Sequence, residues 1–224
     1  MKTILINFII AFSILSFSVN AQKSDYNPKD PKAKEVLDKL TNKAKSYSSM
    51  HVEFDYTMEN LQEKSNDKHS GEFWIKDKKY KIHLMGSHIY FDGKTQWTHM
   101  VDAEEVNVTE PDEDDESILN PTNIFSFYKE GFKYRYNDVK TINGIQVHEI
   151  DLFPENPKEK QFTKVRLHIN KSNNDIQSIK YFGKDGINYI IDVKKLTPNI
   201  SIADTAFTFD KSKNPDVEII ELRK

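Results

Sequence analysis

The sequence contains no cysteine among its 224 residues, and only seven glycines and eight prolines. Without cysteine the chain forms no disulfide, carries no thiol nucleophile, offers no thiolate to a metal and has no cysteine for a lipid anchor. The 32 lysine and arginine residues are nearly balanced by 35 aspartate and glutamate residues. Because binding to phosphate backbones requires a dominant positive surface, nucleic acid is excluded as the main partner.

Long hydrophobic runs are also scarce. One apolar run, from Ile4 to Phe17, follows Lys2 and precedes Val19-Asn20-Ala21. This pattern is typical of a secretory signal peptide, which has a charged start, an apolar stretch too short to span a bilayer and a small residue before the cleavage site. We therefore predict a signal peptide over residues 1–21, a single domain over residues 22–224 and export from the cytoplasm.

The exported part opens with a predicted helix. Asp30 is suited to cap its N-terminus, and Pro31 occupies the first helical position, where a missing N–H has no cost. Apolar residues then recur at helical spacing on one face, while lysines occupy the rest. These apolar residues are Ala33, Val36, Leu37, Leu40, Ala44 and Tyr47.

After Ser49 the hydrophobic period changes from 3.6 to 2, which indicates strands with one apolar side. The rest of the chain repeats this pattern between turn signals, so we predict a mainly β (α+β) fold, an antiparallel meander of about eleven strands curled into a barrel or half-barrel. Asp92-Gly93 and Asn143-Gly144 are typical of type I′ hairpin turns. We also expect a polar loop at 60–68, a short helix at 121–128 and a late strand at Phe207 and Phe209.

Signatures of catalysis are missing as well. The seven histidines form no H-E-x-x-H motif, and no G-x-S-x-G, P-loop or G-x-G-x-x-G motif occurs. We therefore predict no catalytic residues, no metal site and no cofactor. A secreted hydrolase that uses one pair of the many carboxylates remains an alternative, although nothing in the sequence selects a pair.

The most distinctive feature is a set of apolar side chains on the first half of the predicted sheet. They form either an ordinary core or an apolar cavity roofed by helices. For Phe73 and Trp74, which are adjacent and therefore point to opposite faces, we assign Phe73 to the cavity. The candidate cavity residues are Val52, Phe54, Tyr56, Phe73, Ile75, Tyr80, Ile82, Leu84, Ile89, Phe91 and Trp97, and the candidate lid residues are Val36, Leu37, Leu40, Ile124 and Phe125.

Several of these residues also carry a resemblance. The block G-E-F-W-I-K at 71–76, Tyr80, the block F-D-G-K-T-Q-W at 91–97, Asn120-Pro121 and F-T-F at 207–209 resemble the LolA family of periplasmic lipoprotein carriers. The likeness extends over almost the whole chain after the predicted signal peptide. The two blocks are specific in combination, whereas either block alone is a weak signal.

The resemblance implies an incomplete antiparallel β-barrel with short helices that form a lid over a hydrophobic cavity. It also implies a monomer in the periplasm that receives acylated lipoproteins from an inner-membrane exporter and delivers them to the outer membrane, to an acceptor that the sequence does not identify. Such a carrier has a clear physical task. Each CH₂ group is worth roughly 0.8 kcal/mol, so a ~16-carbon chain costs on the order of 10 kcal/mol to expose to water.

One departure from the family pattern concerns the lid. Many members have Arg-Pro directly after the tryptophan block, and that arginine holds the empty cavity shut. This sequence has Asp77-Lys78 there, so Lys76 or Lys78 is the candidate replacement, without the planar fork of arginine.

The resemblance leaves a second interpretation, an RseB-like periplasmic module that senses lipids or lipoproteins on the same fold. Such proteins carry a further C-terminal domain, whereas this sequence ends at Lys224.

Overall fold

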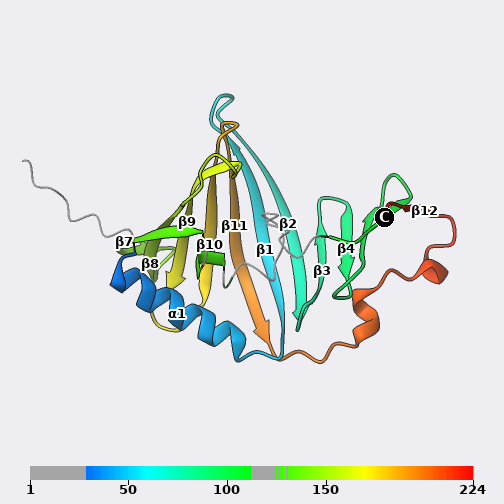
Figure 1. Ribbon diagram of the computed structural model, residues 1–224, viewed down its shortest axis with the longest axis horizontal. Coiled ribbons are helices and arrows are strands. Elements are labelled where there is room, and N and C mark those ends of the chain that lie inside the picture. Colours follow the sequence, from blue (N-terminus) through cyan, green and yellow to red (C-terminus); the bar gives the residue numbers. More distant parts are fainter. Residues whose placement is uncertain (1–28, 112–124, 126, 130, 224) are drawn as a thin grey trace, which may run out of the picture.

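The computed structural model describes residues 29–111, 125, 127–129 and 131–223. The predicted signal peptide and the candidate lid residue Ile124 lie outside these residues, as does most of the predicted helix at 121–128. Within the described residues the chain folds as one α-helix set against a twelve-stranded sheet (Figure 1).

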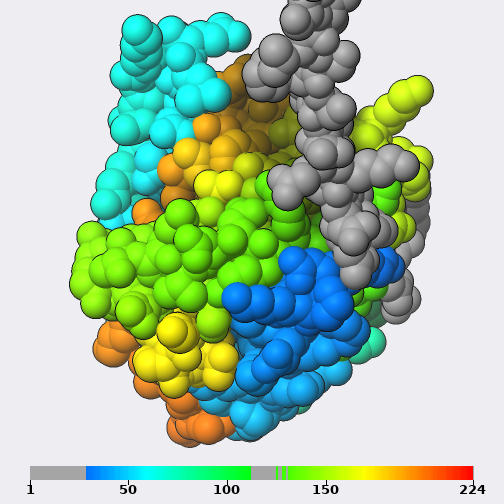
Figure 2. Space-filling view, turned by 90° about the vertical axis from the view of Figure 1, so that its left-hand side faces the viewer, coloured from blue at the N-terminus to red at the C-terminus, as the bar shows by residue number. Residues whose placement is uncertain are grey.

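The single α-helix is α1 (Pro31–Lys45), and it begins where the sequence predicts. The Asp30 side chain accepts hydrogen bonds from the backbone N–H groups of Lys32 (2.8 Å) and Ala33 (3.3 Å), which satisfies donors that the helix itself leaves unpaired. The predicted apolar face is the buried one, since Val36, Leu37 and Leu40 are all buried. In Figure 2 the helix (blue) packs beside the green surface of the 131–154 region.

The strands form one open sheet in the order β12-β6-β5-β4-β3-β2-β1-β11-β10-β9-β8-β7. Neighbouring strands are antiparallel except β12 and β6, which are parallel. This arrangement confirms the predicted mainly β, incomplete barrel. The strands are β1 (Ser49–Asn60), β2 (Ser65–Lys76), β3 (Lys79–Leu84), β4 (Ser87–Phe91), β5 (Gln96–Met100), β6 (Glu105–Thr109), β7 (Phe132–Ile142), β8 (Ile145–Pro154), β9 (Phe162–Asn170), β10 (Ile176–Gly183), β11 (Ile187–Pro198) and β12 (Glu218–Glu221).

Two predicted element boundaries are wrong. The polar segment 60–68 is mostly strand, because β1 and β2 continue as a projecting ribbon in which polar side chains are exposed and backbone hydrogen bonds suffice. The late strand is not at Phe207 and Phe209. Residues Asp204–Phe207 form a 3₁₀ turn (η2), and β12 comes later and pairs with β6.

The two predicted type I′ turns differ in outcome. Asn143 (φ 48°) and Gly144 (φ 80°) both have positive φ, as that turn requires. At the other hairpin Gly93 has positive φ (101°) but Asp92 does not. The Asp92 carboxylate instead accepts hydrogen bonds from the N–H groups of Lys94 (2.9 Å) and Thr95 (2.8 Å), so a side-chain-braced loop replaces the two-residue turn.

Candidate functional site

The sheet has an inner face, on which α1 packs, and an outer face on the opposite side. Most of the predicted cavity residues meet on the inner face, where they are buried in one apolar cluster with α1 and with the far half of the sheet. Ile89 and Phe91 are partly buried against the same cluster. The buried members are Val52, Phe54, Tyr56, Phe73, Ile75, Tyr80, Ile82 and Leu84.

Trp97 does not lie with the other candidate cavity residues. It pairs with Tyr90 across the hairpin, next in register to the inner-facing pair Phe91 and Gln96, so it points to the opposite face. It packs against Val106 and other members of a small second cluster on the outer face. Phe73 faces inward as assigned, whereas its neighbour Trp74 stacks on His51 on the outer face, with ring centroids 4.5 Å apart.

The elements predicted to form the lid are α1 and, among the described residues, the segment at Phe125, which the 3₁₀ turn η1 (Phe127–Lys129) follows. Phe125 is buried against the same apolar cluster as Val36, Leu37 and Leu40. Polar contacts fasten this segment to the helix. The Thr41 hydroxyl donates to the Phe125 carbonyl oxygen (2.5 Å), and the Tyr128 hydroxyl donates to Asp38 Oδ1 (3.0 Å).

We call these contacts of Asp38, Thr41, Phe125 and Tyr128 the α1 latch. Thr41 Oγ1 also lies 3.0 Å from the Tyr128 hydroxyl, so the two hydroxyls join one network. Burial, together with the Asp38 carboxylate, raises the pKa of Tyr128 to about 12. The phenol therefore keeps its proton, and with it the donor role, throughout the physiological pH range.

Lys76 does not replace the family arginine at the lid. Its Nζ atom pairs with Asp204 (2.7 Å) and with the Ile202 carbonyl oxygen (3.2 Å), and Lys79 pairs with the same carboxylate (2.5 Å). These two hydrogen-bonded lysines lower the pKa of Asp204 to about 2. They tie the segment after β11 to the sheet, while Lys78 is exposed. The sequence alone did not identify Thr41, Asp38 or Tyr128 as the groups that fasten the lid.

A cavity of about 310 Å³ opens where the C-terminal end of α1 meets the start of β1. Its apolar lining comes from Ala44, Tyr47, Met50, Ile75 and Phe125. This volume lies in the range of small-molecule sites. We call it the α1 mouth, because it is the point where the apolar cluster beneath the helix reaches the surface.

The outer face of β1–β5 carries a second set of side chains that the sequence analysis did not single out. One cross-strand row runs Glu53, Glu72, His83, His88 and His99. In the sequence these side chains alternate with the inner-facing apolar residues, and that alternation could have placed them together on the outer face. Within the described residues no three histidine or acidic side chains are arranged to hold a metal ion.

The sequence profile of the family described as outer membrane lipoprotein carrier protein LolA matches residues 23–185. The chain belongs to this family. No protein with a curated description matches the sequence.

Several solved structures match this chain at low sequence identity. An uncharacterized conserved protein from Thermus thermophilus matches with a TM-score of 0.58 and 8% identity, covering 85% of this chain and 99% of that one. A putative outer membrane lipoprotein-sorting protein domain from Vibrio parahaemolyticus has a TM-score of 0.44 and 11% identity, covering 83% and 100%. The LolA superfamily protein NE2245 from Nitrosomonas europaea has a TM-score of 0.42 and 12% identity, covering 79% and 97%. In the described part of the chain, α1 is too short and too polar to cross a bilayer.

Proposed function

We propose that this protein is a periplasmic carrier that shelters the acyl chains of lipoproteins beneath α1 and moves them from the inner to the outer membrane. The observation that carries the proposal is the continuous apolar inner face, covered by one helix with a mouth at its end. The family description supports the class of cargo. The predicted signal peptide over residues 1–21 would deliver the chain to that compartment.

The energies of loading and closure are compatible with this role. The α1 latch contains a small number of hydrogen bonds, each worth about 0.5–1.5 kcal/mol net. Burial of a ~16-carbon chain is worth on the order of 10 kcal/mol. Burial of a chain that enters at the α1 mouth can therefore offset the loss of the latch hydrogen bonds.

The decisive test is release of newly synthesised lipoprotein from spheroplasts by the protein purified after export. We expect a lipoprotein to appear in the soluble fraction in complex with the added protein. If lipoproteins remain in the membrane pellet at every protein concentration, the carrier proposal is wrong. Lipid that co-purifies without any lipoprotein would favour the sensing module instead.

A variant at the α1 mouth locates the cargo. Ala44→Trp fills the cavity between α1 and β1 without placing a charge in the apolar cluster, so we expect release to fall about tenfold, in line with the cost of obstructing an apolar site. Lys158→Glu, on an exposed loop remote from the mouth, serves as the control and should release lipoprotein normally. Thermal unfolding of both variants separates lost binding from lost folding.

A further inference from the structure

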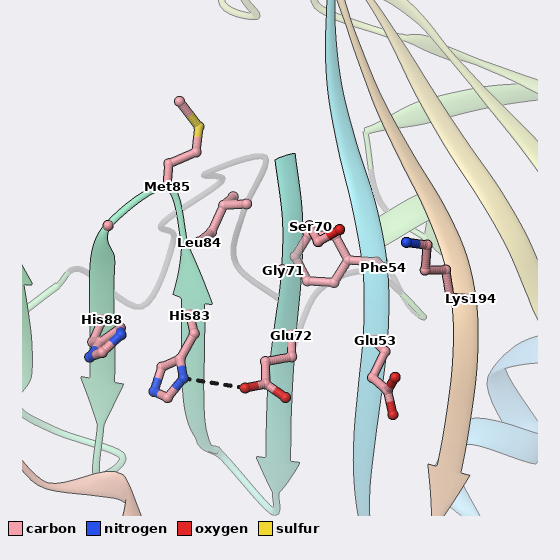
Figure 3. Close-up of a pocket in the computed structure, with 11 residues that line it drawn as sticks. Glu53, Phe54, Ser70, Gly71, Glu72, His83, Leu84, Met85, His88 and Lys194 are labelled. Atoms are coloured by element: carbon pink, nitrogen blue, oxygen red, sulfur yellow. Dashed lines mark ion pairs between the residues drawn. The ribbon is translucent and has the colours of Figure 1, made fainter. Parts of the chain in front are cut away.

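A second opening lies on the other side of the sheet, beside β2 at the point where β3 ends (Figure 3). It measures about 500 Å³, within the range of ligand sites, and receives residues from β1, β2, β3, β4 and β11. Beyond Glu72 and its partner His83, β2 continues along β1 without β3 beside it. We call this opening the β2 notch.

The floor of the β2 notch is part of the apolar interior. Phe54 and Leu84, which line it, are also buried members of the inner cluster. Gly71 lets these two side chains pack directly against β2, because a Cβ atom there would lie 2.7 Å from Phe54 Cζ and 3.0 Å from Leu84 Cδ1. Figure 3 shows the Phe54 ring at the level of Gly71, with Met85 above it at the rim. The methionine side chain is 48% exposed and flexible, which suits a variable apolar ligand.

The polar rim of the notch has one under-compensated carboxylate. Glu53 pairs with Lys195 (3.3 Å), and Lys194 pairs with Asp55 (2.6 Å). Glu72, in contrast, pairs among the described residues with two imidazoles, those of His51 (3.0 Å) and His83 (3.4 Å).

The His83 imidazole on β3 does not neutralise the negative charge of Glu72. Burial, the neighbouring His88 and Lys81 lower the pKa of His83 to about 4, so that ring is neutral at neutral pH. The Lys81 ammonium, which interacts electrostatically with Glu72, lies over the Trp74 ring, 3.8 Å from its centroid. Glu72 therefore presents negative charge beside an apolar floor.

We propose that the β2 notch binds a single-chain amphiphile with an ammonium headgroup. The alkyl chain lies past Gly71 against Phe54 and Leu84, and the ammonium group is held by the carboxylate of Glu72. Apolar burial supplies the affinity, and the unbalanced carboxylate supplies the preference for a cation over an anion. This site is separate from the α1 mouth, so it stands or falls independently of the carrier proposal.

The test compares two probes of equal chain length, dodecylammonium and dodecanoate, both below their micelle concentrations. Since the chain has no natural cysteine, a fluorophore on Met85→Cys reports the notch alone, and one on Ala44→Cys reports the α1 mouth. We expect dodecylammonium to change the fluorescence at position 85 at lower concentration than dodecanoate. We also expect Glu72→Gln to weaken dodecylammonium binding by about tenfold, the usual effect of losing a hydrogen bond to a charged group.

Glu63→Gln is the matched control, because it makes the same charge change at the exposed tip of the same hairpin and should leave binding within about twofold. Equal binding of both probes, or an unchanged affinity in Glu72→Gln, overturns the proposal. A response at position 44 without one at position 85 also overturns it, while leaving the α1 mouth supported.

Discussion

The two halves of the outer face of one continuous sheet are built on different chemistry. Across β7–β10, charged side chains pair from strand to strand, and the fully buried Asp151 side chain accepts hydrogen bonds from Arg166 (2.7 and 2.9 Å) and Lys164 (3.2 Å). Across β1–β5, imidazole and indole rings stack on one another beside the ion pairs of Glu53 and Asp55. His83 and His88 stack with centroids 3.9 Å apart.

The difference shows how one backbone supports two kinds of surface. In the charged half each carboxylate has nearby cations, so this face is electrostatically complete and contributes to stability. In the half formed by β1–β5, the rings offer a surface on which the segment after β11 can pack, as Phe209 does against His99 (5.3 Å between centroids). The β2 notch lies in this second half, where charge is not fully balanced.

The largest expected effect comes from breaking the charged half at its centre. Asp151→Ala removes the carboxylate that Arg166 and Lys164 share and leaves their cations uncompensated, so we expect the free energy of unfolding to fall by about 2–4 kcal/mol. Urea denaturation measures the loss. Asp151→Asn keeps the shape but removes the charge, so a loss equal to that of Asp151→Ala would assign the effect to charge, and stability close to that of the unmodified protein would assign it to packing.

A pH titration separates the contribution of the imidazole rings from that of the carboxylates. The pKa of His83 is lowered to about 4 in the folded protein, against 6.5 for an unperturbed histidine, so the unfolded chain binds the extra proton between these values. Stability from this ring is therefore fully present above pH 6.5 and is lost as the pH falls toward 4, by about 1–2 kcal/mol once partial exposure is allowed for.

The carboxylates respond in a lower window. Burial alone would raise the pKa of Asp55, but hydrogen bonds from Lys194, Lys68 and Ser70 outweigh it and lower the pKa to about 2. Its contribution is present above the unfolded pKa near 4 and is lost as the pH falls toward 2. Chemical denaturation at a series of pH values should show the higher window shrink in His83→Gln while the lower one persists; a remainder is expected because the pKa values of His88 and His148 are also lowered by burial. An unchanged higher window in this variant would assign it to those other histidines.

The smallest expected effect is at an exposed pair on the border between the halves. Lys195→Ala removes the partner of Glu53, and both side chains are largely exposed, so we expect a change below about 0.5 kcal/mol. The same denaturation assay measures it. A loss as large as that of Asp151→Ala would mean that the border, rather than the buried carboxylate, carries the electrostatic stability.

Local sequence patterns predicted most of the fold, because strand alternation and helix spacing are set by which face is buried. Asp30 and Pro31 fixed the start of α1, and alternation from Met50 assigned the inner face of β1. Trp97 was misassigned for a physical reason. It is apolar because residues far later in the chain, including Val217, cover the outer face of β5 and β6. Local alternation carries no information about such a distant partner.

The lid shows the same limit in another form. The resemblance directed attention to a residue after the tryptophan block, whereas the α1 latch uses Thr41 and Asp38 on the helix and Tyr128 on a distant segment. Thr41 lies beside the apolar face of α1, and the helical periodicity of the sequence gives it no further role. Its partners are 84 and 87 residues away, so only the fold reveals the pairing.

The two lateral margins of the open sheet have a consequence for how the molecule behaves at high concentration. An unpaired strand is a template for addition of another chain. At one margin, Lys29, two residues before α1, bridges to Tyr134 of β7, and Asp30 donates its N–H to the Tyr134 carbonyl oxygen (3.2 Å). At the other, β12 covers β6 and ends the sheet with a four-residue strand that carries Glu218 and Glu221. Short, charged or bridged margins resist edge-to-edge polymerisation, so a half-barrel can remain open along its side without assembling into fibres.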